Sequence, residues 1–278
     1  MIVTTEWLQA HLNDDNLRII DIRGHVLPAS EPPPHYFHHR ADYDASHIPG
    51  AVFVDWVNDI TDPDSPNGTQ IAPPEAYAAL MSRLGIGDDS FVVVYDDANG
   101  MFAARMWWSL HYYGHSDVAV LDGGWQKWTA EGLPVTADTP TIPPATFTPR
   151  PNPALRRTIE EVAAALDKPV TLLDVRSEAE FNGETSRVER AGRIPGAVNF
   201  TRKQMLGEDG GFAAPETLRE RFAAIGLTDP DAEVVVYCNA GVSASYGMMA
   251  LKLAGFQNIA VYDGSWKEWG RDDTRPIE

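Results

Sequence analysis

An internal repeat constrains the fold of this chain more than any other feature of its sequence. The segment 20–23 (IDIR) is echoed by 173–176 (LDVR), 47–52 (HIPGAV) by 193–198 (RIPGAV), 92–95 (VVVY) by 234–237 (VVVY), and 120–125 (VLDGGW) by 261–266 (VYDGSW). The matches keep their order, and the offset between copies shortens only slowly along the chain. A period this long excludes a solenoid. We therefore expect two copies of one complete domain that differ in their loops.

Each copy shows the pattern of a parallel α/β sheet. The β-branched runs at 92–95 and 234–237 are preceded by stretches of helical composition at 74–84 and 215–225. Short apolar runs that alternate with helices are typical of parallel strands covered on both faces. The predicted fold class is therefore α/β, with two tandem domains, each a parallel sheet flanked by helices on both faces. The motif Asp-Gly-[Gly/Ser]-Trp near the end of each copy is predicted to be a turn.

Proline marks the boundary between the two copies. The segment 136–155 carries prolines at 140, 143, 144, 149, 151 and 153. Because proline lacks an amide N–H and fixes φ, this density excludes a helix and favours a semi-rigid extended linker. We therefore predict a first domain at 1–135, a linker at 136–155 and a second domain at 156–278.

The net charge of the chain limits the classes of partner that we expect it to bind. Asp and Glu total 40 against 22 Lys and Arg, which gives the 278 residues a formal net charge of −18. Nucleic acids and anionic membranes select positive surfaces, so we expect neither as a partner. No stretch approaches the ~20 apolar residues of a membrane-spanning helix, and the start of the chain lacks the basic and apolar regions of a targeting signal. These features favour a cytoplasmic protein.

The cysteine and histidine content argues against disulfides and metals. Cys238 is the single cysteine, so neither an intramolecular disulfide nor a multi-cysteine metal site can form. A metal site could be considered for four histidines of the first copy, His35, His38, His39 and His47. They lack the spacing of helical ligand pairs and an obvious third ligand. We expect no metal site and no organic cofactor.

Cys238 begins a loop built for binding an anion. The loop follows the strand run 234–237 and contains small residues at Ala240 and Gly241 before a helical stretch. In open parallel sheets ligands gather at the carboxyl ends of strands, and a loop that enters a helix there turns free N–H groups toward one point. Such donors stabilise a thiolate or an anion attached to it.

The first copy lacks this thiol. The position equivalent to Cys238 is Asp96, followed by Asp97-Ala98-Asn99-Gly100. A lone cysteine at the end of an apolar strand is usually an inert buried residue. A charged residue would be an odd replacement for packing material, however, so the repeat favours a reactive Cys238 and a silent first copy.

Taken together, these motifs resemble the tandem-domain rhodanese sulfurtransferases. The resemblance covers nearly the whole chain and lies in the ordered combination of Asp-x-Arg, [His/Arg]-Ile-Pro-Gly-Ala, the cysteine loop and Tyr-Asp-Gly-[Ser/Gly]-Trp. In that family the N-terminal domain is catalytically silent and the C-terminal domain carries the nucleophile. The resemblance implies that Cys238 takes sulfane sulfur from a small anionic donor, becomes a persulfide, and passes the sulfur to a thiophile such as cyanide or a thiol.

The resemblance also assigns the persulfide-binding loop. It comprises Asn239, Ala240, Gly241, Val242 and Ser243, where the family has Thr or Ser at the last position. The Ser243 hydroxyl would donate to the persulfide, or alternatively would cap the following helix. Thiosulfate-using relatives have two cationic residues after the cysteine and mercaptopyruvate-using relatives have Gly followed by Ser or Thr. Asn239 and Ala240 fit neither pattern, so both donors stay open, with thiosulfate favoured.

Positive charge for the donor is expected from the loop at 185–193. Arg187 best matches the position of the family's substrate-anion arginine, and Arg190 is the second choice. The repeated pair Asp174 and Arg176 is expected to be structural, because Asp21 and Arg23 recur in the silent copy.

Two other functions remain to be weighed. A cysteine phosphatase needs an arginine shortly after the cysteine to clamp phosphate, and no arginine occurs between Cys238 and Arg271. The alternative is a sulfur-carrier or docking module, in which the Cys238 persulfide is delivered to a protein partner, and the sequence is also compatible with it. Turnover with small donors would distinguish these two.

Overall fold

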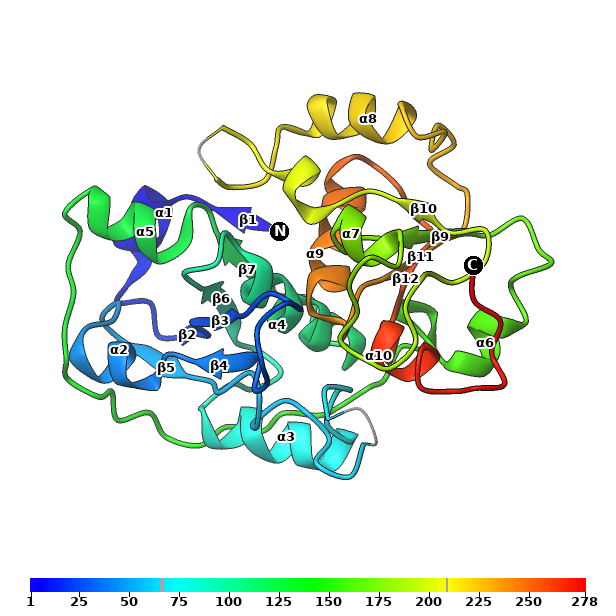
Figure 1. Cartoon of the computed structure of the whole chain (residues 1–278). Helices are drawn as coiled ribbons and strands as arrows, with labels where there is room; N and C mark the ends of the chain where they lie inside the picture. The colour runs from blue at the N-terminus through cyan, green and yellow to red at the C-terminus, as the bar shows by residue number, and fades with distance from the viewer. Residues whose placement is uncertain (66–67, 209) are drawn as a thin grey trace. The chain divides into compact units, whose positions relative to one another are not determined.

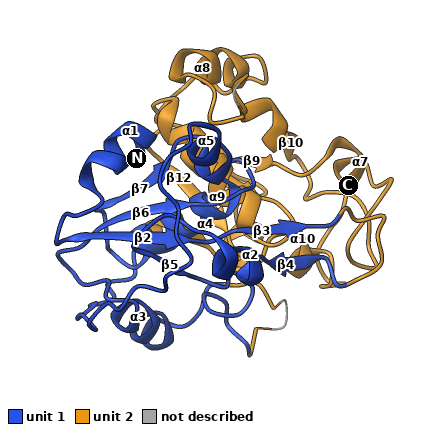
Figure 2. Ribbon diagram, turned by 90° about the vertical axis from the view of Figure 1, so that its left-hand side faces the viewer, with its two compact units in different colours: residues 1–27, 34–63, 71–152 blue, residues 28–33, 64–70, 153–278 orange. Residues whose placement is uncertain are grey.

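The chain forms two compact units (Figure 2). A computed structural model describes residues 1–65, 68–208 and 210–278. Unit 1 comprises Met1–Leu27, Pro34–Pro63 and Ile71–Asn152, and unit 2 comprises Pro28–Pro33, Asp64–Gln70 and Pro153–Glu278. Residues 137–152 form neither helix nor strand and belong to unit 1. Unit 2 is therefore discontinuous in sequence, because two short segments of the first copy belong to it.

Each unit contains a five-stranded parallel sheet with the same topology (Figure 1). In unit 1 the strand order is β1 (Ile2–Val3), β7 (Val118–Leu121), β6 (Phe91–Tyr95), β2 (Leu17–Asp21) and β5 (Ala51–Phe53). In unit 2 the corresponding order is β8 (Arg156–Arg157), β12 (Ile259–Tyr262), β11 (Val234–Tyr237), β9 (Thr171–Asp174) and β10 (Val198–Asn199). The predicted fold class, two tandem α/β domains, is confirmed.

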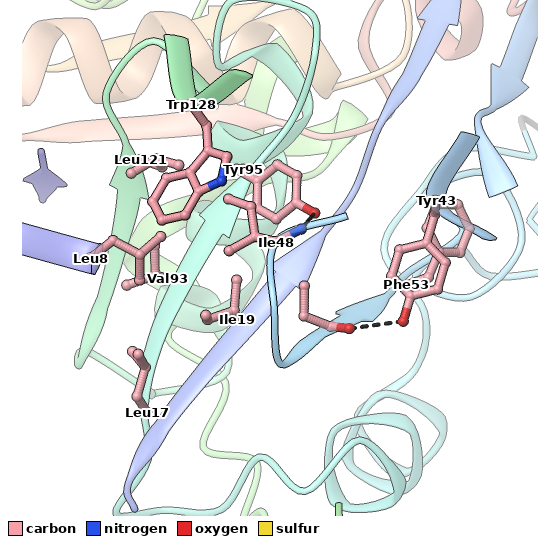
Figure 3. Packing of buried hydrophobic residues seen from close by; sticks show 11 residues of the cluster. Leu8, Leu17, Ile19, Tyr43, Ile48, Phe53, Val93, Tyr95, Leu121 and Trp128 are labelled. Atoms are coloured by element: carbon pink, nitrogen blue, oxygen red, sulfur yellow. Dashed lines mark hydrogen bonds between the residues drawn. The ribbon is translucent and has the colours of Figure 1, made fainter. Parts of the chain in front are cut away.

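Helices cover the sheet of unit 1. The elements are α1 (Thr5–His11), α2 (Arg40–Ala45), α3 (Pro74–Arg83), α4 (Met101–Tyr112) and α5 (Gly124–Ala130). Alternate strand residues such as Ile19 and Val93 pack with Leu8 of α1 and Trp128 of α5 in one core cluster (Figure 3). Helix α4 packs on β6 and β7, and Tyr77 of α3 is hydrogen-bonded to it through Ser109, with the two hydroxyl oxygens 2.7 Å apart.

The helices of unit 2 follow the same plan. They are α6 (Ile159–Ala163), α7 (Glu178–Phe181), α8 (Pro215–Ala223), α9 (Val242–Leu253) and α10 (Ser265–Trp269), with 3₁₀ turns at Pro153–Leu155 and Arg202–Met205. Val162 of α6 and Trp269 of α10 share one buried cluster with strand residues. Helix α9 lies close to the sheet at Gly247, where a Cβ would come within 2.9 Å of Val236 Cγ1. The helix that follows Cys238 is thus held tightly against the strand that precedes it.

The Ile-Pro-Gly-Ala motif forms the same turn in both units. The Ala51 N–H donates to the Ile48 carbonyl at 3.0 Å, and the Ala197 N–H donates to the Ile194 carbonyl at 3.1 Å. Both central glycines have positive φ, +82° at position 50 and +74° at position 196. Proline followed by a glycine in this conformation is the requirement of a type II turn. The motif therefore leads the chain into the edge strands β5 and β10.

The Asp-x-Arg motif forms a buried ion pair in each unit. Arg176 Nη2 lies 2.6 Å from Asp174 Oδ2 and donates to the Gly192 carbonyl at 2.8 Å. Its guanidinium carbon lies 4.5 Å from the ring centroid of Trp266. In unit 1 Arg23 repeats the pair with Asp21 and lies 4.2 Å from the Trp125 ring. Because both units have this ion pair, we infer that it stabilises the ends of β2 and β9. It is not specific to the unit that carries the cysteine.

The Asp-Gly-[Gly/Ser]-Trp motif differs from its predicted turn. Helix α5 begins at Gly124 and α10 begins at Ser265, so the motif opens a helix in each unit. Both of these residues have φ +53°. This left-handed conformation suits glycine but strains serine. Helices of five and seven residues carry too little periodicity for the sequence to show them.

The first unit also contains a hairpin that the repeat does not predict. Strands β3 (Gly24–Val26) and β4 (Tyr36–His38) pair antiparallel between β2 and α2. His39 lies directly after β4 and is hydrogen-bonded to His25, with His39 Nε2 2.7 Å from His25 Nδ1. Its other ring nitrogen, Nδ1, lies 2.6 Å from Asp97 Oδ2. Within 1–65, 68–208 and 210–278, no group of three or more His, Cys, Asp or Glu side chains could hold a metal ion. Nor does any helix of these ranges have the length and apolar character to cross a membrane.

Candidate active site around Cys238

Cys238 lies between a buried strand and the start of a long helix. It follows Tyr237, the last residue of β11, and its exposed fraction is 4%. Gly241 caps the N-terminus of α9 with φ +75°, so three residues separate the end of the strand from the cap. The backbone N–H groups at the start of such a helix have no intrahelical acceptor. The thiol therefore stands where the sheet and a helix N-terminus meet.

Ser265 supports the loop from the neighbouring helix. Its Oγ accepts hydrogen bonds from the N–H groups of Cys238 and Gly241, both at 3.1 Å, and donates to the Tyr262 carbonyl at 2.8 Å. Sequence reasoning missed this residue. Ser265 stands where the first copy has Gly124, and the structure gives both residues a positive φ. A strained residue of this kind often marks a functional site.

Three further loop amides remain for an anion. The N–H groups of Asn239, Ala240 and Val242 have no acceptor within the part of the chain that the structure describes. Ala240 is buried, and so is Val242 at the first position of α9. Neutral residues at these positions leave the backbone as the source of partial positive charge next to Cys238. This arrangement can stabilise a negative sulfur without a side-chain cation in the loop.

Asn239 connects the loop to Arg187. Its Nδ2 donates to Glu180 Oε1 at 2.7 Å, and Arg187 Nε lies 3.4 Å from the same carboxylate oxygen. The side chains of Arg187 and Glu180 are 9% and 10% exposed. Ser177 Oγ donates to the second oxygen, Glu180 Oε2, at 2.8 Å. Arg187 is thus brought to the cysteine loop through a fixed carboxylate, which sequence reasoning did not identify.

Arg190, the second candidate, has a different environment. Its Nη1 donates to the Asp272 carbonyl at 2.6 Å and its Nη2 donates to the Arg275 carbonyl at 2.8 Å. These bonds tie the 185–193 loop to the C-terminal segment. Of the two arginines, Arg187 is the one that Glu180 links to the cysteine loop.

Ser243 does not cap α9. The N-cap is Gly241, and Ser243 is the second residue of the helix. The alternative that its hydroxyl serves as an N-cap is therefore wrong, because the positive φ of Gly241 ends the loop two residues earlier. Ser243 stands on the first turn of the helix, next to Val242.

Lys267 adds a second cation near the loop. Its backbone N–H donates to the Asn239 carbonyl at 2.9 Å, and the Trp266 N–H donates to the Cys238 carbonyl at 2.9 Å. Burial, together with the positive charges of Arg271 and Arg187, lowers the pKa of Lys267 to about 8. The backbone of this lysine therefore lies directly against Asn239.

The equivalent loop of unit 1 contains its own anion. The Asp96 carboxylate accepts four backbone N–H bonds of 2.7–2.9 Å, one oxygen taking two and the other taking two. The donors are Ala98, Gly100, Phe102 and Ala103. Burial raises the pKa of Asp96, while these N–H groups oppose that shift. Four backbone donors of this region are therefore already taken by a carboxylate of the chain itself.

Both copies match a single family model. The description of that model is "Rhodanese-like domain", and it matches residues 4–131 and 158–272. The chain belongs to the rhodanese family of sulfurtransferases.

Curated relatives of this rhodanese chain span its length. It is 38% identical over 282 residues to a "Probable 3-mercaptopyruvate sulfurtransferase" of Pseudomonas aeruginosa, covering 99% of this chain and 97% of the relative. It is 35% identical over 284 residues to the "Sulfur carrier protein TtuD" of Thermus thermophilus, covering 97% and 93%. A "Thiosulfate sulfurtransferase" of Corynebacterium glutamicum is 34% identical over 290 residues, covering 100% and 90%.

A solved structure confirms the tandem rhodanese architecture. SseA from Escherichia coli, described as a 3-mercaptopyruvate sulfotransferase with the rhodanese fold, matches with a TM-score of 0.83 and 30% identity. The match covers 95% of this chain and 98% of SseA. The relatives thus bear names of two donor types and of a sulfur carrier.

Proposed function

We propose that this rhodanese moves sulfane sulfur from a small anionic donor, through a persulfide on Cys238, to a thiophilic acceptor such as cyanide or a thiol. Thiosulfate is the favoured donor and 3-mercaptopyruvate the second. The observation that carries the proposal is the position of Cys238, the single cysteine, at a helix N-terminus whose loop amides face no carboxylate of their own. Catalysis is placed in residues 156–278, and residues 1–135 are the silent domain.

The first step forms the persulfide. With thiosulfate, the Cys238 thiolate attacks the outer sulfur, a new S–S bond forms, and the bond to the sulfonate sulfur breaks. Sulfite leaves with the electron pair of that bond, and Cys238 holds a persulfide anion. In the second step the acceptor attacks the terminal sulfur, which frees the thiolate. The balance requires no metal, organic cofactor or external electrons.

The loop stabilises the sulfur anion in both states. The N–H groups of Asn239, Ala240 and Val242 are available donors beside the cysteine. Hydrogen bonds to an ionised acceptor are about twice as strong as neutral ones, and here they are fixed by the backbone before the reaction begins. Ser265 keeps the loop in this conformation by accepting from Cys238 and Gly241. Ser243 is proposed as a further hydroxyl donor on the same turn.

Arg187 is proposed to bind the donor anion. It is the arginine that Glu180 and Asn239 link to the cysteine loop. A guanidinium group matches the planar fork of a carboxylate and the oxygens of a sulfonate. Positioning the donor in this way holds the sulfur that is transferred against the thiolate.

A second candidate function is a persulfide carrier that delivers sulfur to a protein partner. The similarity to the sulfur carrier of Thermus thermophilus favours it. In that case the same Cys238 persulfide forms, but turnover with small acceptors is slow.

Steady-state sulfur transfer to cyanide tests both candidates. Thiosulfate and 3-mercaptopyruvate are compared on the wild type, Cys238→Ser and Arg187→Ala. We expect Cys238→Ser to abolish transfer while the fold is retained, and Arg187→Ala to raise the donor KM about tenfold, the usual size of a lost charged hydrogen bond. Full activity of Cys238→Ser would disprove the mechanism, and an unchanged KM would move donor binding to another residue.

If turnover with small donors is absent, mass spectrometry separates a persulfide carrier from a protein that takes up no sulfur. Folded, reduced wild type that forms a persulfide with thiosulfate, seen as an added sulfur atom on Cys238 by mass spectrometry, but does not turn over with cyanide would establish the carrier function. Protein that neither turns over nor gains sulfur would overturn both candidates.

A further inference from the structure

Helix α10 is fastened to the cysteine loop along its first turn. Ser265 Oγ accepts from Cys238 and Gly241, the Trp266 N–H donates to the Cys238 carbonyl, and the Lys267 N–H donates to the Asn239 carbonyl. These bonds place the backbone of Lys267 against the residue that follows the cysteine. Lys267 is half-buried.

A second cation reaches the other side of Asn239. The Asn239 amide donates to Glu180, and Glu180 pairs with Arg187. The positive charges of Arg187 and Arg271 also help to lower the pKa of Lys267. Asn239 is therefore linked to α10 through its carbonyl and to Arg187 of the 185–193 loop through Glu180.

The acidic groups nearby have other partners. The Glu180 carboxylate is shared by Arg187, Asn239 and Ser177. Glu268, next to Lys267 on α10, accepts from Gln70 Nε2 at 3.0 Å and is hydrogen-bonded to Tyr262. Asp263 is fully buried, with an oxygen 3.3 Å from Arg156 Nε.

The first copy has a neutral residue at the position of Lys267. Alignment of Trp125 with Trp266 places Gln126 there, and its Nε2 donates to the Asp97 carbonyl at 2.5 Å. The lysine is thus present only in the copy that carries the cysteine. A purely structural role in fastening the helix would need only the backbone N–H of this residue.

We propose that Lys267 is a donor-recognition residue which, together with Arg187, selects a doubly charged sulfur donor of the thiosulfate type over a singly charged carboxylate donor. The proposal rests on the function proposed above and names its substrate class. Lys267 and Arg187 supply from two other elements the pair of positive charges that Asn239 and Ala240 do not provide. A dianion gains about twice the Coulomb energy of a monoanion from the same cation.

The two cations also suit the departing group. When the S–S bond of thiosulfate breaks, its electron pair leaves with the sulfonate sulfur and the product is a sulfite dianion. Cations that lie beside the sulfonate oxygens in the bound donor stay beside the same oxygens as sulfite forms. Lys267 is therefore expected to lower the donor KM more than it changes the acceptor KM.

Binding of thiosulfate to the Cys238→Ser protein tests the proposal without turnover. Calorimetric titration at about pH 7 compares this protein with versions that also carry Lys267→Met or Lys267→Arg. We expect Lys267→Met to weaken the Kd about tenfold, the scale of one charged hydrogen bond, and Lys267→Arg to stay within about threefold. Binding of 3-mercaptopyruvate should change by less than about threefold in either variant, since a monoanion gains less from the cation.

Lys252→Met is the matched control. Lys252 is also a partly buried lysine whose pKa is lowered by burial, but it lies in the last turn of α9. At about 1.5 Å per residue it is roughly 15 Å along the helix from the cysteine loop. Its loss should leave the Kd for thiosulfate unchanged.

The pH dependence of the Kd gives a second readout. Lys267 is charged below its pKa of about 8 and neutral above it. Thiosulfate binding should therefore weaken between about pH 7 and pH 9.5 with lysine present and stay constant with Lys267→Arg, because arginine keeps its charge.

The outcomes separate this proposal from the proposed function. Cys238-dependent transfer combined with a Kd that Lys267→Met leaves unchanged would overturn the role of Lys267 alone. Equal weakening for thiosulfate and 3-mercaptopyruvate would overturn the selectivity. Lys267-dependent binding of thiosulfate by a protein whose Cys238 gains no sulfur would support the recognition site and overturn the proposed function.

Discussion

The loops that follow β6 and β11 begin alike and are completed in opposite ways. Each leaves a buried Val-Val-Val-Tyr strand and ends on a glycine with positive φ, Gly100 at +80° and Gly241 at +75°. In unit 1 the loop is one residue longer, and the Asp96 carboxylate accepts four of its N–H groups. In unit 2 Ser265 from α10 accepts two N–H groups, and the residue equivalent to Asp96 is Cys238.

This difference shows how one fold supplies both a structural and a reactive loop. A helix N-terminus with several free N–H groups needs an anion or a polar partner in either case. Asp96 is an anion tethered to the chain, so unit 1 is complete without a ligand. In the proposed function Cys238 changes its charge and its attached sulfur, so the unit 2 loop would hold several species in turn. Unit 1 has therefore kept the anion site and filled it with Asp96.

Moving the thiol into the first loop gives the largest expected effect. We predict that Asp96→Cys combined with Cys238→Ser stays at the level of Cys238→Ser alone, about a thousandfold or more below the wild type, the scale of a lost nucleophile. Unit 1 has Gly124 and Gln126 in place of Ser265 and Lys267, so the new thiol lacks their support. Steady-state transfer to cyanide is the measurement, and a rate within tenfold of the wild type would show that the loop alone is sufficient.

Removal of the Asp96 charge tests whether its carboxylate stabilises the loop of unit 1. We predict that Asp96→Asn lowers the free energy of unfolding by about 2–4 kcal/mol, because the amide NH₂ would face two N–H groups that lose their acceptor. Urea unfolding followed by tryptophan fluorescence measures the change.

Cys238→Ser, the substitution at the equivalent position, is the control and should cost less than about 1 kcal/mol. A similarly small loss for Asp96→Asn would mean that the four N–H groups do not depend on the carboxylate.

Substitution of Ser265 by alanine or glycine gives the smallest expected effect. We predict that Ser265→Ala and Ser265→Gly each slow sulfur transfer about tenfold, because the Cys238 and Gly241 amides lose their acceptor. Ser265→Gly should be about 1 kcal/mol more stable than Ser265→Ala, since only glycine adopts φ +53° without strain. Equal stability of the two variants would show that the serine conformation carries no strain.

The fold could be predicted because its signals are local. Buried strands such as 234–237 show within a few consecutive residues, and the role of Cys238 stays a prediction. The repeat adds a second copy of each signal, which separates Asp96 from Cys238 and the shared frame from the reactive position.

The remainder of the candidate site could not be predicted, because it is assembled by tertiary packing. Glu180, Ser265 and Lys267 reach the loop from elements that lie before and after it in the sequence. No spacing rule connects them to Cys238. The capping alternative for Ser243 failed for a related reason, because the conformation of Gly241 decides where the helix begins.

The discontinuity of unit 2 has a consequence for the order in which the two units fold during translation. The segments Pro28–Pro33 and Asp64–Gln70 emerge from the ribosome long before residue 153, yet they belong to the later unit. Unit 1 can fold before the rest of unit 2 has been made, and Gln70 meets Glu268 only when almost the whole chain has been synthesised. Translation therefore completes unit 1 first, and a chain interrupted before α10 lacks Ser265, the acceptor for the Cys238 and Gly241 amides.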